Sequence, residues 1–306
     1  MILRFEILFI ALAFLSGCSQ IIDYEIPIEP PVPVVNAFIN PDSLFAINVT
    51  GSRHVLDDNY DFKPLTGFQV QVYQNERLLG ETWGDEEGNY VLEDFYPEYG
   101  QSYRIELNKE GVPAVSARDI IPSSSPEFSI LSHKLKEEDY SIFHIFELEI
   151  DNPEDPTFFE ITAFAYQYFY DWQPTGPPIL MDSAYLAFPV FTDNPIADNA
   201  ADFYGRQSIL FSNTLINTPT FKIDINMGYV PFRNQYDNDF DSAQVDIIVR
   251  GVSENYYYYL NSFRLQQESQ GDPLAEPVMV YTNIKNGLGI FSSYVQSKQS
   301  YLVSPR

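Results

Sequence analysis

Apolar and polar residues alternate with a period of two through much of the first half of the chain. Turn-forming residues separate the alternating stretches, at Asn75-Glu76, at residues 84–89 and at residues 108–111. This pattern is typical of antiparallel strands with one buried face, and it predicts a small β-sandwich over residues 34–122. The apolar positions that define it are Phe45, Ile47, Val49, Phe68, Val70, Val72, Tyr103, Ile105 and Leu107.

The second half continues with strand-like runs and contains one predicted helix. The helix is expected near residues 253–268, because Ser253 can cap it, Glu254 suits its first turn, and Tyr256, Tyr259, Leu260 and Phe263 share one face. The strand-like runs are residues 142–150, 157–170, 207–211, 221–227, 244–250, 277–282 and 289–294.

Residues 171–205 break the strand pattern. They are rich in proline, Asp and Asn and have few periodic runs, so we expect a long excursion with short strands. The whole chain is therefore predicted to be mainly β, with two β-sandwich-like domains and one short helix. The second, larger β domain would span residues 126–306.

The N-terminal segment indicates where in the cell the protein is located. An apolar run ends in Leu15, Ser16, Gly17 and Cys18, the order of a bacterial lipobox, and the run is too short to span a bilayer. We expect residues 1–17 to be a lipoprotein signal peptide and Cys18 to carry diacylglycerol and a further acyl chain such as palmitate. Residues 18–33, rich in proline, would be an extended tether. An ordinary secretory signal with a chance cysteine is the alternative.

Charge and cysteine content exclude several classes of function. The chain has 43 acidic and 17 basic residues, a formal net charge of −26, so nucleic acid is not an expected partner. Cys18 is the only cysteine, which leaves no internal disulfide.

Motifs for catalysis are missing from the sequence. His54, His133 and His144 are far apart along the chain and form no His-Glu-x-x-His motif, and no Gly-x-Ser-x-Gly elbow occurs. We therefore expect no catalytic residues. The alternative is an envelope glycan- or peptide-processing enzyme that uses paired carboxylates, which so acidic a chain can always supply.

One acidic segment resembles the start of a calcium loop. Asp237, Asp239 and Asp241 have the alternating spacing, but Ser242 replaces the needed glycine and Ile248 stands where a bidentate Glu is required. We expect no resident metal or other cofactor, with Ca²⁺ at these acids as the open alternative.

Aromatic residues around the start of the excursion are the candidate contact surface for a ligand or partner. Trp172 is flanked by Tyr168 and Tyr170, and Tyr185 follows within the excursion. Such a group suits stacking on a sugar ring or packing against a protein, although an ordinary core cluster at a strand end has the same composition.

Two regions of the sequence resemble known families. Residues 64–70, the acidic Gly-Asn turn at residues 85–90 and the strand from Tyr103 are similar to the carboxypeptidase-regulatory or transthyretin-like sandwich. The Tyr-rich run at residues 256–260 and the segments 271–278, 281–284 and 286–291 resemble DUF4249, a family of Gram-negative lipoproteins without established activity. Genes of that family commonly lie beside those of TonB-dependent receptors.

The resemblance and the lipobox together predict a non-catalytic lipoprotein of the outer membrane. It would be a binding or accessory partner of a TonB-dependent nutrient transporter and face either the periplasm or the cell surface. A small-molecule ligand and the oligomeric state stay open at this point. In the Gly-rich C-terminal segment, Gly287 and Gly289 are expected at positions of close backbone approach or positive φ, with Asn283 and Asn286 in turns.

Overall fold

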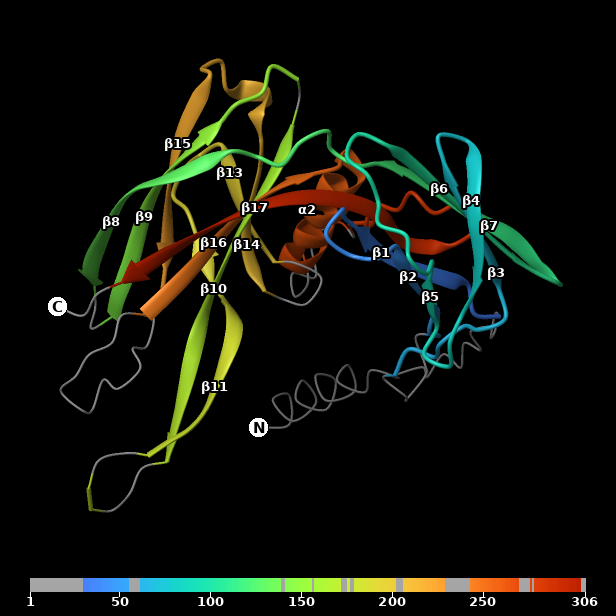
Figure 1. Ribbon diagram of the computed structural model, residues 1–306, viewed down its shortest axis with the longest axis horizontal. Coiled ribbons are helices and arrows are strands. Elements are labelled where there is room, and N and C mark those ends of the chain that lie inside the picture. Colours follow the sequence, from blue (N-terminus) through green and yellow to red (C-terminus); the bar gives the residue numbers. More distant parts are fainter. Residues whose placement is uncertain are drawn as a thin grey trace, which may run out of the picture.

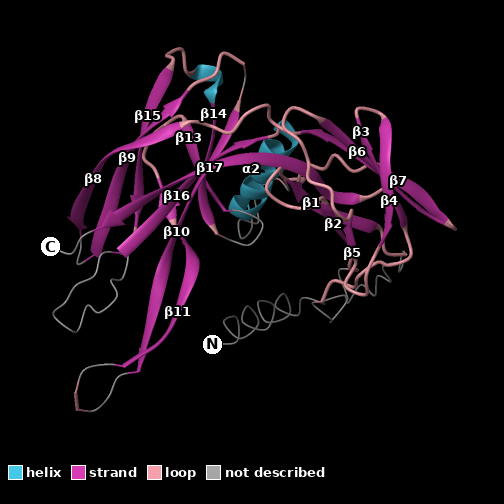
Figure 2. Cartoon of the chain, in the orientation of Figure 1, coloured by secondary structure: helices cyan, strands magenta, loops and turns pink. Residues whose placement is uncertain are grey.

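The computed structural model describes residues 30–54, 61–138, 141–155, 157–171, 175–176, 179–201, 206–228, 243–269, 276 and 278–303. The predicted signal peptide, Cys18, most of the tether, Trp172, and Asp237, Asp239 and Asp241 lie outside these residues. In the described part the protein is mainly β, as predicted, with several sheets and a single α-helix (Figure 2).

The described residues up to position 120 form seven strands, and the predicted alternation is confirmed. All nine apolar positions of the pattern are buried on the inner faces of strands or directly beside them. The Asn75-Glu76 turn has φ values of 48° and 67°, the left-handed geometry of a tight hairpin between β3 and β4. The strands are β1 (Pro33–Ile39), β2 (Ala46–Gly51), β3 (Gln69–Gln74), β4 (Arg77–Trp83), β5 (Asn89–Val91), β6 (Ser102–Lys109) and β7 (Val112–Ile120).

The second half contains the remaining strands and the helix. α2 (Glu254–Ser269) follows the predicted cap at Ser253, whose side chain accepts from the amide of Tyr256 at 3.3 Å. The strands are β8 (Phe128–Glu138), β9 (Ser141–Asp151), β10 (Phe158–Asp171), β11 (Ile179–Phe188), β12 (Val190–Phe191), β13 (Ala197–Ala201), β14 (Gln207–Ser212), β15 (Thr220–Met227), β16 (Ala243–Val252) and β17 (Leu288–Val303).

Two sandwiches share one long sheet. That sheet has the order β13-β14-β10-β16-β17-β1-β2-β5, with β11 paired to β10 beside this path (Figure 1). The sheet β4-β3-β6-β7 packs on the end that holds β1 and β2, and the sheet β12-β15-β9-β8 packs on the end that holds β10 and β16. Each sandwich has its own hydrophobic core.

β17 joins the two sandwiches, so residues 34–122 do not close the first one by themselves. Residues 288–293 of β17 pair in parallel with β1, and residues 294–303 pair antiparallel with β16 on the other side. Ile284, Phe291 and Val295 pack into the core of the first sandwich. The first sandwich therefore depends on the last strand of the chain.

Close backbone contact between β1 and β17 requires glycine at position 289. Its φ is +90°, and a Cβ placed there would lie 2.1 Å from the carbonyl oxygen of Val35. Gly287 likewise lies against the carbonyl of Pro33, and Asn286 has a φ of 57°. The side chain of Asn283 bonds both backbone groups of Phe291, at 3.0 and 2.7 Å. The predicted packing and turn roles of this segment are confirmed.

The helix lies on the outer face of the shared sheet. Tyr256, Tyr259 and Leu260 are buried there against Leu210, Val252 and Ile290, while Phe263 is half-buried. Beneath the helix, the fully buried Glu160 carboxylate pairs with Arg250 at 2.8 Å and accepts from the Tyr256 hydroxyl at 2.7 Å. This pair fixes the helix over β10 and β16, because removing one member would leave the other charge buried without a partner.

The excursion predicted for residues 171–205 contains short strands, β12 and β13, as expected. It also contains the ten-residue strand β11, longer than predicted, which pairs with β10 from Ala163 to Asp171. Residues 278–282, expected in a strand, run beside the helix without strand pairing, with the Tyr281 amide donating to Ser262 at 2.8 Å. Among the described helices none is long and apolar enough to cross a bilayer.

Substitution of Gly289 by alanine tests the shared strand. We expect Gly289→Ala to destabilise the chain by about 3 kcal/mol or more, since a Cβ there displaces the β1 backbone in addition to the strain of positive φ. Gly111→Ala is the matched control, because Gly111 has a φ of +77° with open space around it. It should cost about 1 kcal/mol. Urea denaturation of both variants checks the difference, and equal losses would contradict the role assigned to Gly289.

Candidate functional site

A β-hairpin arm formed by β10 and β11 projects from the body of the second sandwich (Figure 1). β16 accompanies β10 only as far as Ala165, and the two strands of the arm continue beyond it. Several large apolar side chains on the arm are exposed to solvent and are not buried in the hydrophobic core of the neighbouring sandwich. They are Ile179 (55% exposed), Met181 (66%), Tyr185 (41%) and Leu186 (41%).

The predicted contact residues lie on this arm where the structure describes them. Tyr185 stacks on Phe164 with ring centres 5.5 Å apart and contacts Tyr166 at 5.2 Å. Tyr168 and Tyr170 belong to β10, and their side chains are outside the described part, as is Trp172. The arm therefore combines aromatic and aliphatic side chains on one narrow element.

A polar anchor fixes the base of the arm to the sheet. The Tyr185 hydroxyl donates to the carboxylate of Asp246 on β16, which also accepts from Ser300 at 2.6 Å and from Lys298 at 3.3 Å. Burial favours the neutral acid, but these hydrogen bonds outweigh it and lower the pKa of Asp246 to about 2. Burial and the hydrogen bond to Asp246 raise the pKa of Tyr185. The anchor therefore stays an ionised acceptor and a neutral donor at neutral pH.

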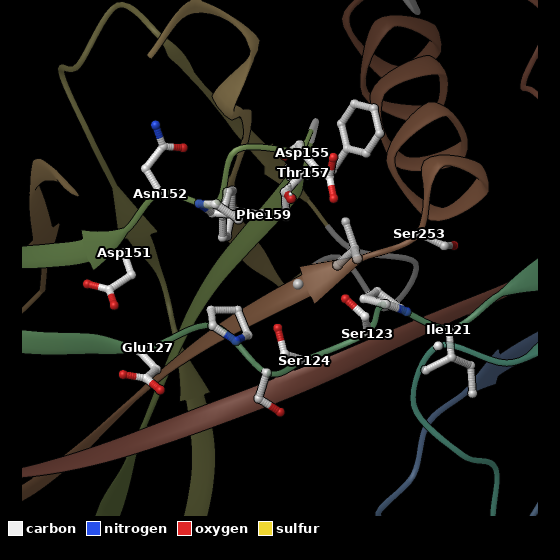
Figure 3. Close-up of a pocket in the computed structure, with 18 of the residues that line it drawn as sticks. Ile121, Ser123, Ser124, Glu127, Asp151, Asn152, Asp155, Thr157, Phe159 and Ser253 are labelled. Atoms are coloured by element: carbon white, nitrogen blue, oxygen red, sulfur yellow. Dashed lines mark hydrogen bonds between the residues drawn. The ribbon is translucent and has the colours of Figure 1, made fainter. Parts of the chain in front are cut away.

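An open groove of about 900 Å³ lies at the junction of the two sandwiches (Figure 3). One wall is the linker of residues 122–126, and another is the loop of residues 151–155. The end of β16 and the first residues of α2 close the groove. Asn213 holds the loop in place, with its amide nitrogen 2.9 Å from Asn152 Oδ1 and 3.0 Å from the carbonyl oxygen of Pro153.

Hydroxyls and carboxylates line part of the groove, beside apolar residues such as Ile120, Pro122 and Phe158. Its described lining residues include Ser123, Ser124, Glu127, Asp151 and Asp155 but no His, Cys, Lys or Arg. Such a surface can hydrogen-bond a hydroxylated or cationic ligand, and it offers no nucleophile paired with a base. The described residues hold no cluster of three or more His, Cys, Asp or Glu that could bind a metal ion.

Asp119 is a buried carboxylate where the first sandwich meets the helix. It lies on β7, next to the groove residues Ile120 and Ile121, and accepts from the side chain of Asn255 on α2 at 2.7 Å. Burial raises the pKa of Asp119 to about 6, against the effect of its hydrogen bonds. The sequence offered no signal for this residue, since an Asp in a strand of alternating pattern normally faces solvent.

Two histidines that are separate in the sequence come together in the structure. The β8–β9 hairpin places His133 Nε2 3.0 Å from His144 Nδ1, beside Phe146 and Tyr301. Burial, together with the neighbouring His133, lowers the pKa of His144 to about 4. His144 is buried, and its ring stays neutral at physiological pH.

The described geometry defines a mainly β protein of two sandwiches on a shared sheet, with a projecting arm and an open groove. The chain belongs to the family DUF4249, a domain of unknown function, whose model matches residues 20–300. No curated protein matches it.

Similar solved structures are distant. The major pilin subunit BcpA of Bacillus cereus is 10% identical with a TM-score of 0.25, over 90% of this chain and 69% of that one. A putative carbohydrate binding protein from Bacteroides uniformis is 12% identical with a TM-score of 0.16, over 74% of this chain and 91% of that one. At such TM-scores neither supports a functional statement about this chain.

Replacing Asp119 by asparagine tests the buried carboxylate. Because the folded-state pKa of about 6 exceeds the ordinary value of 3.8, the folded protein binds the proton more tightly, and stability from this group is lost as the pH rises from 4 to 6. We expect Asp119→Asn to match the wild type near pH 4 and to exceed its free energy of unfolding by about 3 kcal/mol at pH 7.

Urea denaturation between pH 4 and pH 7 measures this difference. His144 contributes the opposite pH slope over the same range, since its folded-state pKa is lowered, but it is present in both proteins and cancels. If the difference in free energy of unfolding between the variant and the wild type does not change with pH, the assignment to Asp119 is wrong.

Proposed function

We propose that the protein is an outer-membrane lipoprotein, anchored through Cys18, that acts as a non-catalytic binding or accessory partner of a TonB-dependent nutrient transporter. The arm is the observation that carries this proposal. It exposes Ile179, Met181, Tyr185 and Leu186, and none of these four side chains belongs to either sandwich core. Exposed apolar side chains gathered in this way are characteristic of surfaces that bind another protein.

Anchor, tether and body suit the same role. The lipobox and the Pro-rich residues 18–33 would hold the double sandwich at a distance from the bilayer, and several acyl chains give firm attachment. The strongly acidic composition opposes adsorption to anionic lipid, which leaves the arm able to reach a protein partner. The transthyretin-like character of the first sandwich belongs to this proposal as well.

The groove supports a secondary role in ligand capture. Its hydroxyls and carboxylates suit a hydroxylated or cationic nutrient that would be passed to the transporter. The competing function, a glycan- or peptide-processing enzyme, needs two acids in opposed environments. Glu127, Asp151, Asp155 and Glu254 are all exposed to solvent, so nothing in the groove favours that chemistry.

Lipidation at Cys18 is tested by substitution and mass analysis. We expect Cys18→Ser to move the chain from the membrane fraction to the soluble fraction, because the thioether cannot form. Ser19→Ala, one residue away, should leave fractionation unchanged. Mass spectrometry of the mature N-terminal peptide should show a diacylglyceryl cysteine, and an unmodified thiol in the native protein would refute the anchor.

Docking is tested by shortening the arm. Gln167 and Ala184 are opposite each other in the hairpin, so an Asn-Gly turn can join them in place of residues 168–183. We expect detergent-solubilised outer membranes to yield a TonB-dependent transporter with the wild-type chain, and about ten-fold less with the shortened chain, a loss of about 1.4 kcal/mol.

Point variants distinguish specific binding through the arm from nonspecific hydrophobic binding. Ile179→Ser with Met181→Ser should weaken capture, whereas Leu215→Ser, at a residue 79% exposed in the turn that follows β14, should not. Recovery of no such transporter by the wild-type chain would overturn the proposed function.

A further inference from the structure

The outer edge of β11 has no strand partner among the described elements. β11 pairs with β10 over nine positions from Phe188 to Ile179, and no other strand of the sheets lies against it. In an antiparallel pair, alternate residues direct their backbone amide and carbonyl groups away from the partner. β11 therefore presents a row of hydrogen-bonding groups along its outer side.

One hydrogen bond shows which residues face this edge. The Ser183 amide donates to the side chain of Asp182 at 2.7 Å, a local bond typical of an amide that no neighbouring strand takes. By alternation, the amides of Tyr185 and Ala187 face the same side, and those of Ala184 and Leu186 face β10. The exposed Asp182 carboxylate lies at this edge as well.

Most of the usual protection of an edge strand is absent from residues 182–188 of β11. Natural edges are shortened or interrupted by Lys, Pro or a bulge, because an open edge invites pairing with another chain. Residues 182–188 contain no Lys, Arg or Pro, and the bulge leaves Met181 of β11 without an opposite residue in β10, nearer the tip of the arm. The strand is long and rich in apolar side chains, which favours a partner that covers it.

The base of β11 is fixed in advance of binding. The hydroxyl of Tyr185 is held by Asp246, which Ser300 and Lys298 also bond. Ordering of the strand is therefore largely complete before a partner arrives, and this lowers the entropic penalty of association.

Charge selects the partner. Residues 157–201 contain Glu160, Asp171, Asp182, Asp193 and Asp198 and no Lys or Arg. Glu160 pairs with Arg250 and Asp198 pairs with Arg264, but the exposed Asp182 at the edge itself would repel the same residue in a second copy of this chain. A different protein with Lys or Arg beside an exposed strand is complementary to the arm.

We propose that the outer edge of β11 is a β-strand addition site for a basic strand of another protein. The identity of that protein as a transporter rests on the function proposed above, whereas the strand-pairing mode does not. Main-chain hydrogen bonds would give affinity, and the side chains of Met181, Asp182 and Leu186 would select the alternating residues of the incoming strand.

Residue-resolved hydrogen exchange of the full chain in detergent tests the mode of binding. The probe is a short peptide of alternating Lys and Val. Two matched controls are used: the Glu-Val peptide, and the Lys-Val peptide with one central proline. We expect the Lys-Val peptide to slow exchange at Ser183, Tyr185 and Ala187 by about ten-fold, with little change at Ala184 and Leu186, which are already protected by β10.

The controls decide between strand pairing and simple charge attraction. Equal protection by the proline-interrupted peptide, protection by the Glu-Val peptide, or no protection by any peptide would each overturn strand addition. If the Lys-Val peptide fails while the shortened arm still loses the transporter, docking stands and strand addition is wrong. If the peptide protects alternate amides while the wild-type chain captures no transporter, the strand-addition site stands and the proposed function is wrong.

Discussion

The pairing of β17 with both β1 and β16 is the constraint on which the rest of the structure depends. One strand of 16 residues completes the sheet of the first sandwich and the sheet of the second. Val35 and Gly289 meet across 254 positions of sequence, a contact that only glycine permits at that spacing. The two cores are thereby joined into one structure, because neither sheet is complete without β17. Such long-range pairing is slow to form, because a long loop must close, with a loss of conformational entropy, before the stabilising contacts are made.

Local signals in the sequence were enough for many of the elements and for none of their long-range partners. The alternation at Phe68, Val70 and Val72 specifies a strand with one buried face, and Ser253 specifies where the helix begins. Such patterns do not show that the two sandwiches share a sheet. A repeat of two residues indicates which face of a strand is buried, but it does not indicate which strand pairs with it. The Gly-rich segment at residues 286–289 carried the one local hint, and it was found because close backbone approach needs glycine.

The arm shows why the candidate site was only partly predictable. Prolines at positions 174, 177, 178 and 189 flank β11 rather than interrupt it, so their density concealed a regular strand. Side chains on both faces of the arm are apolar and exposed, which removes the alternation that marks half-buried strands. Tyr185 was identified from its aromatic neighbours, but its partner Asp246 is 61 residues away and the buried Asp119 lies on another sandwich. Those pairings exist only in the folded chain.

The shared strand also makes the two halves vulnerable together. A polypeptide without β17 lacks the strand common to both sheets, so neither layered half can seal its interior. Loss of this one element would expose apolar strands of both halves at once, and proteases readily cut chains opened in this way.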